Sequence, residues 1–131
     1  MKVGHCEQVE QAPVTMEGAS GCQVRWLVDA SEGAPNFAMR QFEVAPGGYT
    51  PRHSHPYEHE VFVLEGEGQV IEGDEPHALK AGDYVFVRPD EVHQFRNTGS
   101  GPMQLFVVYS PAGPELGLRQ LPDFRIVPRS R

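Results

Sequence analysis

Four of the six histidines in the sequence are spaced as the ligands of a metal site would be. His53 and His55 are two residues apart, so on an extended strand both rings point to the same side. His59 follows the segment Pro56-Tyr57-Glu58, which can bend the chain, and His93 lies far along the sequence. Imidazole nitrogen suits Mn, Fe, Co, Ni, Cu and Zn. We therefore predict one divalent transition metal per chain, bound by these four histidines.

A less specific interpretation stays open beside this one. Histidines are ordinary surface residues, so an isolated His-x-His pair more often means exposed rings than ligands. Here a third and a fourth histidine occur in a compatible order, which favours the metal site. His77, which follows Pro76, falls outside the pattern and is expected to be exposed.

Short strands must position these side chains. Glycine and proline together make up about 20% of the chain, against a usual ~12%, which indicates many turns. No helical period persists beyond two turns, and short strands with turn residues between them are typical of an antiparallel sandwich or barrel. The segment Pro46-Gly47-Gly48 is predicted to be one of the turns. The predicted strands are 23–28, 37–45, 50–55, 59–65, 68–72, 76–80, 84–87, 92–96 and 103–109.

Length and charge exclude several classes of protein. A chain of 131 residues corresponds to a single domain. The net charge of −7 disfavours nucleic acid and anionic membranes as partners, and no apolar run approaches the ~20 residues that span a bilayer. Two cysteines without a secretory signal suggest free thiols in the cytoplasm. Residues 110–131, with four prolines, are expected to form a tail over the surface.

Two motifs resemble those of the cupin superfamily. Gly47, His53-Ser54-His55, His59 and Gly66 match the first motif, although that family usually has glutamate where His59 stands. Gly82-Asp83, His93 and Asn97 match the second motif. This sequence departs from it at Arg88 and Asp90, where the motif has proline and glycine.

The resemblance is to small single-domain bacterial cupins of the cupin 2 type with four histidine ligands. It implies an all-β fold, an antiparallel double-stranded β-helix or jelly-roll barrel, covering about 22–109. It also implies manganese as the first candidate metal, with Fe, Ni, Cu, Zn or Co as alternatives. Members of this group form homodimers; here the apolar faces of 22–28 and 37–45, with Trp26, Phe37 and Met39, are the predicted interface.

Neutral imidazole ligands would leave the full charge of the ion uncompensated, which favours a small, anionic substrate at the open positions. The leading hypothesis is a metal-dependent oxygenase. The alternatives are a lyase or isomerase that uses the ion as a Lewis acid, and a non-catalytic module that binds a small ligand. Arg40 and Tyr57 are weak catalytic candidates: Arg40 would meet a substrate carboxylate or form an ion pair at the rim, and Tyr57 would line the mouth or close a turn. Glu58 and Glu60 are expected to point outward.

Overall fold

The computed structural model describes residues 1–110, and within them the protein is built almost entirely from antiparallel strands. Two helical turns, η1 (Cys6–Gln8) and η2 (Ala30–Glu32), have three residues each, so no helix in this part of the chain is long enough to cross a membrane. The strands are β1 (Ala12–Pro13), β2 (Ser20–Val28), β3 (Ala38–Tyr49), β4 (His59–Glu65), β5 (Glu67–Glu72), β6 (Glu75–Lys80), β7 (Tyr84–Val87), β8 (His93–Asn97) and β9 (Met103–Tyr109).

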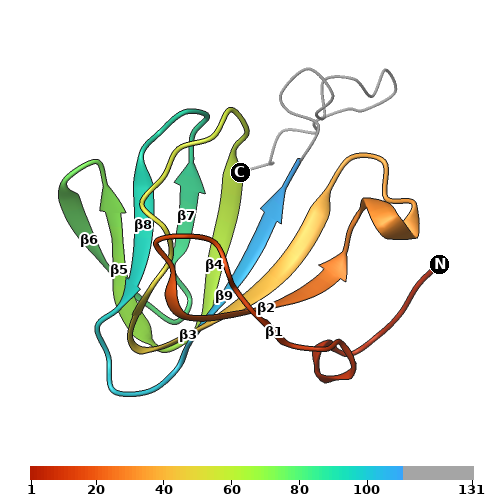
Figure 1. Cartoon of the computed structure of the whole chain (residues 1–131), viewed down its shortest axis with the longest axis horizontal. Helices are drawn as coiled ribbons and strands as arrows, with labels where there is room; N and C mark the ends of the chain where they lie inside the picture. Colours follow the sequence, from red (N-terminus) through yellow and green to blue (C-terminus); the bar gives the residue numbers. More distant parts are fainter. Residues whose placement is uncertain (111–131) are drawn as a thin grey trace, which may run out of the picture.

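All the strands belong to one curled sheet in the order β6-β5-β8-β3-β9-β4-β7, with β2 on β3 and β1 on β2 (Figure 1). The long strand β3 connects the two halves, because residues 38–44 pair with β9 whereas Tyr49 pairs with Arg96 of β8. The sheet therefore folds over on itself as a jelly-roll barrel, which confirms the predicted fold class. The predicted C-terminal tail, 110–131, lies outside the described residues except for residue 110.

Alternating apolar residues fill the barrel. In β9, every second side chain from Met103 to Tyr109 is buried, which is the pattern of a strand with one face on a core. The largest fully buried side chains are Val44, Val63, Val87, Met103 and Leu105. At roughly 1.5–3 kcal/mol for each buried aliphatic side chain, this layer is the main favourable contribution to folding.

Two predicted elements are wrong. The segment Pro46-Gly47-Gly48 is part of β3 rather than a turn: Gly47 has a φ of 79°, and a Cβ on Gly48 would lie 2.6 Å from the carbonyl oxygen of Ser20. These glycines allow a local irregularity and a close approach inside a continuous strand. The predicted strand 50–55 is reduced to a single bridge between His53 and His93. Pro51 cannot donate a backbone hydrogen bond, which explains why a ladder does not form there.

Candidate metal centre

Three of the four predicted ligands converge inside the barrel. His53, His55 and His93 each offer one ring nitrogen, and these nitrogens all lie within 4.8 Å of one another. His53 and His55 come from the loop between β3 and β4, and His93 is the first residue of β8. The cluster therefore joins two segments that are 38 residues apart or more in sequence.

The backbone around the cluster ties these two segments together. The N–H of His53 donates to the carbonyl of His93 at 3.1 Å, and the N–H of His93 donates back to His53 at 3.0 Å. The N–H of Asp90 donates to the carbonyl of His55 at 2.7 Å. Asp90 has a φ of 64°, the left-handed conformation that glycine adopts freely and that aspartate tolerates better than most residues. The departure from the second motif at this position thus keeps the glycine-like conformation.

Backbone carbonyls fix which ring nitrogens can act as ligands. Nδ1 of His55 lies 2.6 Å from the carbonyl oxygen of Tyr57, and Nδ1 of His93 lies 2.8 Å from that of Glu91. A carbonyl only accepts, so each Nδ1 carries the proton and each Nε2 keeps a lone pair. Nε2 of His55 is buried and has no hydrogen-bond partner among the described residues. A buried lone pair without a partner, held in position by a bond at the other nitrogen, fits a metal ligand.

The fourth predicted ligand, His59, adjoins this group without completing it. Its ring centroid lies 4.3 Å from that of His55 and 5.7 Å from that of His93. Its Nε2 contacts Nη2 of Arg40 at 3.4 Å, and the ring of His59 is not part of the cluster of three. The structure thus brings three histidines together and leaves the fourth beside them, in contact with a guanidinium group.

Burial favours the neutral form of three of these imidazoles. It lowers the pKa of His53 to about 4 and that of His59 to about 2, with smaller contributions from neighbouring rings and Arg40 that would repel a second positive charge. It also lowers the pKa of His93. Neutral imidazole is the form that binds a metal ion, so near neutral pH His53, His59 and His93 need no deprotonation before they can act as ligands. The donor set of nitrogens, without oxygen, disfavours Ca²⁺ and Mg²⁺.

An interior cavity of about 100 Å³ reaches the cluster. Its walls are mostly apolar, with Phe42, Val107 and Met16 among them, and its polar side chains include Arg40, Thr50 and three of the histidines. Within residues 1–110, the side chain of Arg40 points inward, packs against aromatic rings and contacts no carboxylate. The register Arg40↔Val107 explains this position, since it puts Arg40 beside the inward face of β9.

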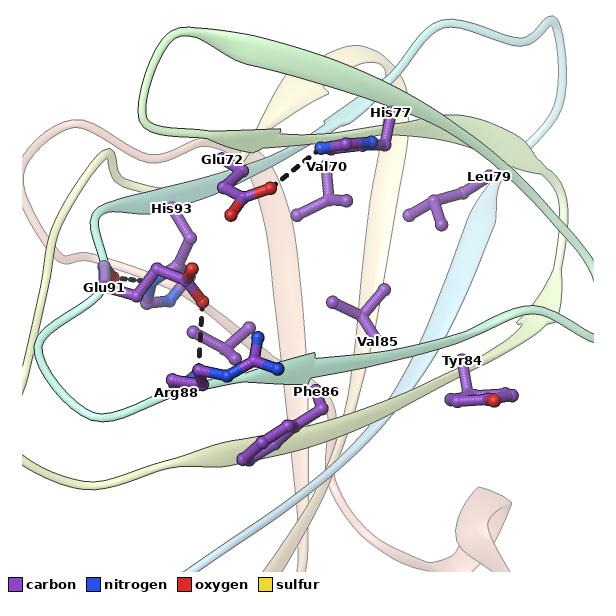
Figure 2. A pocket seen from close by; sticks show the side chains of 11 residues that line it. Val70, Glu72, His77, Leu79, Tyr84, Val85, Phe86, Arg88, Glu91 and His93 are labelled. Carbon is purple, nitrogen blue, oxygen red and sulfur yellow. Dashed lines mark hydrogen bonds and ion pairs between the residues drawn. The ribbon is translucent and has the colours of Figure 1, made fainter.

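A second, more open groove of about 260 Å³ ends at His93 from the other side (Figure 2). Figure 2 shows Val70, Leu79 and Val85 along its floor, with the ion pair between Glu72 and His77 at its rim. The cluster therefore lies between an interior cavity and an open groove.

Tyr109 is the functional residue that sequence reasoning did not single out. Its ring lies 5.5 Å from that of His59 and 5.2 Å from that of Tyr57, and Cζ of Arg40 lies 4.2 Å from its centroid. Alternation along β9 indicates that Tyr109 faces inward, but only the pairing His59↔Tyr109 places it beside the histidines. Tyr57 is stacked on the ring of His55, with 4.2 Å between the ring centroids.

Glu58, Glu60 and His77 are exposed, as expected. Trp26, predicted to lie in a dimer interface, is 42% exposed near the end of β2, and its ring contacts Arg40.

Comparison with known proteins identifies the family. Residues 40–109 match the family model of the cupin domain, and these residues contain both histidine motifs. The chain belongs to the cupin family.

This cupin is 35% identical over 89 residues to protein SchB of Streptomyces halstedii, covering 67% of this chain and 64% of that protein. It is 30% identical to the tetracenomycin polyketide synthase protein TcmJ of Streptomyces glaucescens, covering 70% of this chain and 63% of that protein. The cupin thus spans less than two thirds of the length of these curated relatives.

A solved structure resembles this cupin over most of both chains. The polyketide cyclase RemF from Streptomyces resistomycificus has a TM-score of 0.79 and 33% identity, with 84% of this chain and 79% of that chain covered. A predicted oxalate decarboxylase from Thermotoga maritima superposes with a TM-score of 0.76 at 21% identity, which supports the fold alone. The cupin architecture of the described residues is therefore secure.

Proposed function

We propose that this cupin is a metal-dependent enzyme acting on a small organic molecule. The observation that carries the proposal is the buried Nε2 of His55, which has no partner among the described residues and sits in a cluster with His53 and His93. These three residues would hold one divalent transition metal, with His59 as the fourth ligand and manganese as the first candidate. Such an ion would polarise a carbonyl group and stabilise negative charge that develops on its oxygen.

The residues around the ion would bind and orient the substrate. The carbonyls of Tyr57 and Glu91 hold the rings of His55 and His93, so the ligand set is rigid before a substrate arrives. The apolar walls of the interior cavity would exclude water from the reacting atoms. The groove that ends at His93 provides an open approach for a substrate with an apolar body.

For the reaction class, we infer Lewis-acid chemistry on a carbonyl-rich substrate. The support comes from relatives named as a polyketide synthase protein and a polyketide cyclase. An oxygenase is the second candidate. A ligand set made only of neutral imidazoles would leave coordination positions of the ion open and its positive charge uncompensated, which favours an electron-rich anionic substrate. Turnover of 1,3-diketones or catechols with and without dioxygen separates the two. Equal rates without oxygen favour the Lewis acid, and stoichiometric oxygen uptake favours the oxygenase.

Metal analysis of protein purified without a histidine tag tests the proposal directly. We expect about one ion per chain in the wild type and a loss of at least tenfold in affinity in the double variant His53→Ala, His93→Ala, as expected when ligands are removed. The matched control is His5→Ala, which removes an exposed histidine outside both groups of potential metal ligands among the described residues and is expected to bind the same amount of metal. Unchanged metal content in the double variant would rule out the site.

We also propose a homodimer as the working form. On the outer face of the sheet, Phe62 of β4 pairs directly with Tyr84 of β7, and both are exposed together with Phe86. Trp26 and Phe37 add exposed aromatic side chains on the segments predicted for the interface. β7 is an edge strand of the described sheet, so its backbone can pair with another strand. Together with the outer aromatic face, this edge would contact a second copy of the chain in a twofold arrangement. Sedimentation at micromolar concentration tests it, and a monomer there would contradict it.

A further inference from the structure

Arg40 is a half-buried cation without an anionic partner among the described residues. Its Cζ lies 4.2, 4.8 and 5.1 Å from the ring centroids of Tyr109, Phe42 and Trp26, so its long side chain is enclosed by aromatic faces. Its Nε is buried and has no hydrogen-bond partner in this part of the chain. Charged side chains are rarely buried unless they are paired, because the loss of hydration is costly. The aromatic rings compensate for part of this cost, but they leave the N–H of Nε without an acceptor among the described residues.

The position of Arg40 gives this unpaired group a use. Arg40 lines the same interior cavity as His53, His59 and His93. A guanidinium group presents several N–H donors in a fixed plane, which matches the oxygen atoms of a carboxylate or an enolate. The guanidinium group of Arg40, beside the candidate metal centre, can bind one oxygen of a substrate while a second oxygen of the same molecule faces the ion.

The contact between Arg40 and His59 links this donor to the metal ligands. Nη2 of Arg40 can only donate, so at 3.4 Å from Nε2 of His59 it faces the lone pair of that ring. The same lone pair is the one that His59 would offer to a metal ion. The two interactions exclude each other, and His59 can become a ligand only when Arg40 turns to another acceptor.

We propose that Arg40 is the anion-binding residue of this cavity and that its binding of an anion releases His59 to the metal. The substrate class that follows is a small molecule with an anionic oxygen, a carboxylate or an enolate, next to a second oxygen. This inference rests on the proposed metal-dependent function only for its second part, since anion binding by Arg40 does not require the ion. By linkage, the anion must then raise metal affinity by the same factor by which the metal raises anion affinity.

The experiment uses acetate as the anion, acetamide as its neutral counterpart, and Co²⁺ as the spectroscopic metal. Acetate affinity is measured by calorimetry on metal-free and Co²⁺-loaded protein, and Co²⁺ affinity by competition with a chelator. We expect acetate to bind metal-free wild type and acetamide not to bind. We expect saturating acetate to raise Co²⁺ affinity by about fivefold or more, the lower end of common coupling between sites, and to change the visible absorption of the bound ion.

Three variants separate the steps. Arg40→Met keeps a long apolar side chain in the aromatic enclosure, and it should lose acetate binding while binding Co²⁺ at least as tightly as the wild type without acetate. His59→Ala should still bind acetate but lose the enhancement of Co²⁺ affinity. Arg96→Met, which removes an exposed arginine outside the cavity, should behave as the wild type.

The outcomes are distinguishable. Acetate binding that is unchanged in Arg40→Met overturns the assignment of Arg40, and an enhancement that persists in His59→Ala overturns the release of His59. If wild type binds acetate through Arg40 but never binds Co²⁺, the proposed metal-dependent function fails, the release of His59 is overturned with it, and the anion-binding role of Arg40 is supported.

Discussion

Replacing Asn97 with alanine should remove a buried junction that connects three parts of the barrel. The side-chain amide of Asn97 donates to the carbonyls of Val44 and Gly101, each at 2.8 Å, and its oxygen accepts from the N–H of Gly99 at 2.9 Å. The residue is only 3% exposed, so water cannot readily replace these bonds. The junction holds the end of β8 against β3 and the turn before β9, and β8 begins with His93.

The expected loss follows from counting these bonds. A typical hydrogen bond contributes about 0.5–1.5 kcal/mol net, so three of them give about 3 kcal/mol for Asn97→Ala. Urea unfolding followed by fluorescence measures this loss. With a slope of about 2 kcal/mol per molar urea, the midpoint should fall by about 1.5 M.

Two further variants make this test sharp. Asn97→Asp keeps the acceptor for Gly99 but places a carboxylate against the carbonyls of Val44 and Gly101, so at pH 7 it should be less stable than Asn97→Ala. Thr98→Ala changes the exposed neighbour and should shift the free energy of unfolding by no more than about 0.5 kcal/mol. If Asn97→Ala matches Thr98→Ala, the hydrogen bonds of Asn97 do not support the barrel and the reasoning is refuted.

Other predictions concern pH, backbone conformation and packing. Glu60 is exposed as a residue, but partial desolvation of its carboxyl group, reinforced by the neighbouring carboxylate of Glu58, raises its pKa from 4.5 to about 7. The folded protein therefore binds the extra proton between these values, and its stability falls as pH rises from 4.5 through 7. Glu60→Gln should therefore stabilise the protein relative to wild type at pH 8 and not at pH 4 in thermal unfolding; a constant difference would contradict this. Asp90→Gly should keep both stability and metal affinity, whereas Asp90→Val, with a branched side chain at a φ of 64°, should lose about 1–2 kcal/mol in urea unfolding and bind metal more weakly in a chelator competition. Gly68→Ala should cost about 1–3 kcal/mol, because its Cβ would lie 2.3 Å from the carbonyl oxygen of Arg96, while Gly101→Ala meets open space and serves as the control in the same assay.

Much of the fold follows from local sequence patterns. Alternation from Met103 to Tyr109 predicts a strand with one buried face, and the structure has that strand at those bounds. Asparagine is typical of turns that its own side chain stabilises, and Asn97 bonds to Gly99 and Gly101 in the turn before β9. These predictions succeed because a period of two and a local side-chain bond depend on neighbouring residues alone.

The errors arise where an element depends on distant partners. A glycine pair after proline is typical of a turn, yet the structure continues β3 through Gly47 and Gly48 because Ser20 of a neighbouring strand packs against Gly48. The segment 50–55 alternates like a strand, but its hydrogen bonds go to individual groups of β8. No local pattern records these neighbours.

The sequence by itself determined which side chains can carry the chemistry. The spacing of the four histidines, His53, His55, His59 and His93, predicted a transition-metal site in a β-barrel, and the structure brings three of them, all but His59, into one cluster. It did so because ligand chemistry belongs to residue types, and the order of motifs along a chain constrains which of them can meet.

Only the tertiary structure decided how each of these groups is used. Strand register puts Arg40 opposite Val107 and His59 opposite Tyr109, so a guanidinium group from one strand faces an imidazole from another. The backbone carbonyls of Tyr57 and Glu91 select the free nitrogens of His55 and His93. Pairing of strands across the barrel decides the direction of each lone pair and the burial of each group. It also decides that no carboxylate among the described residues lies near Arg40. That pairing depends on the packing of the whole core.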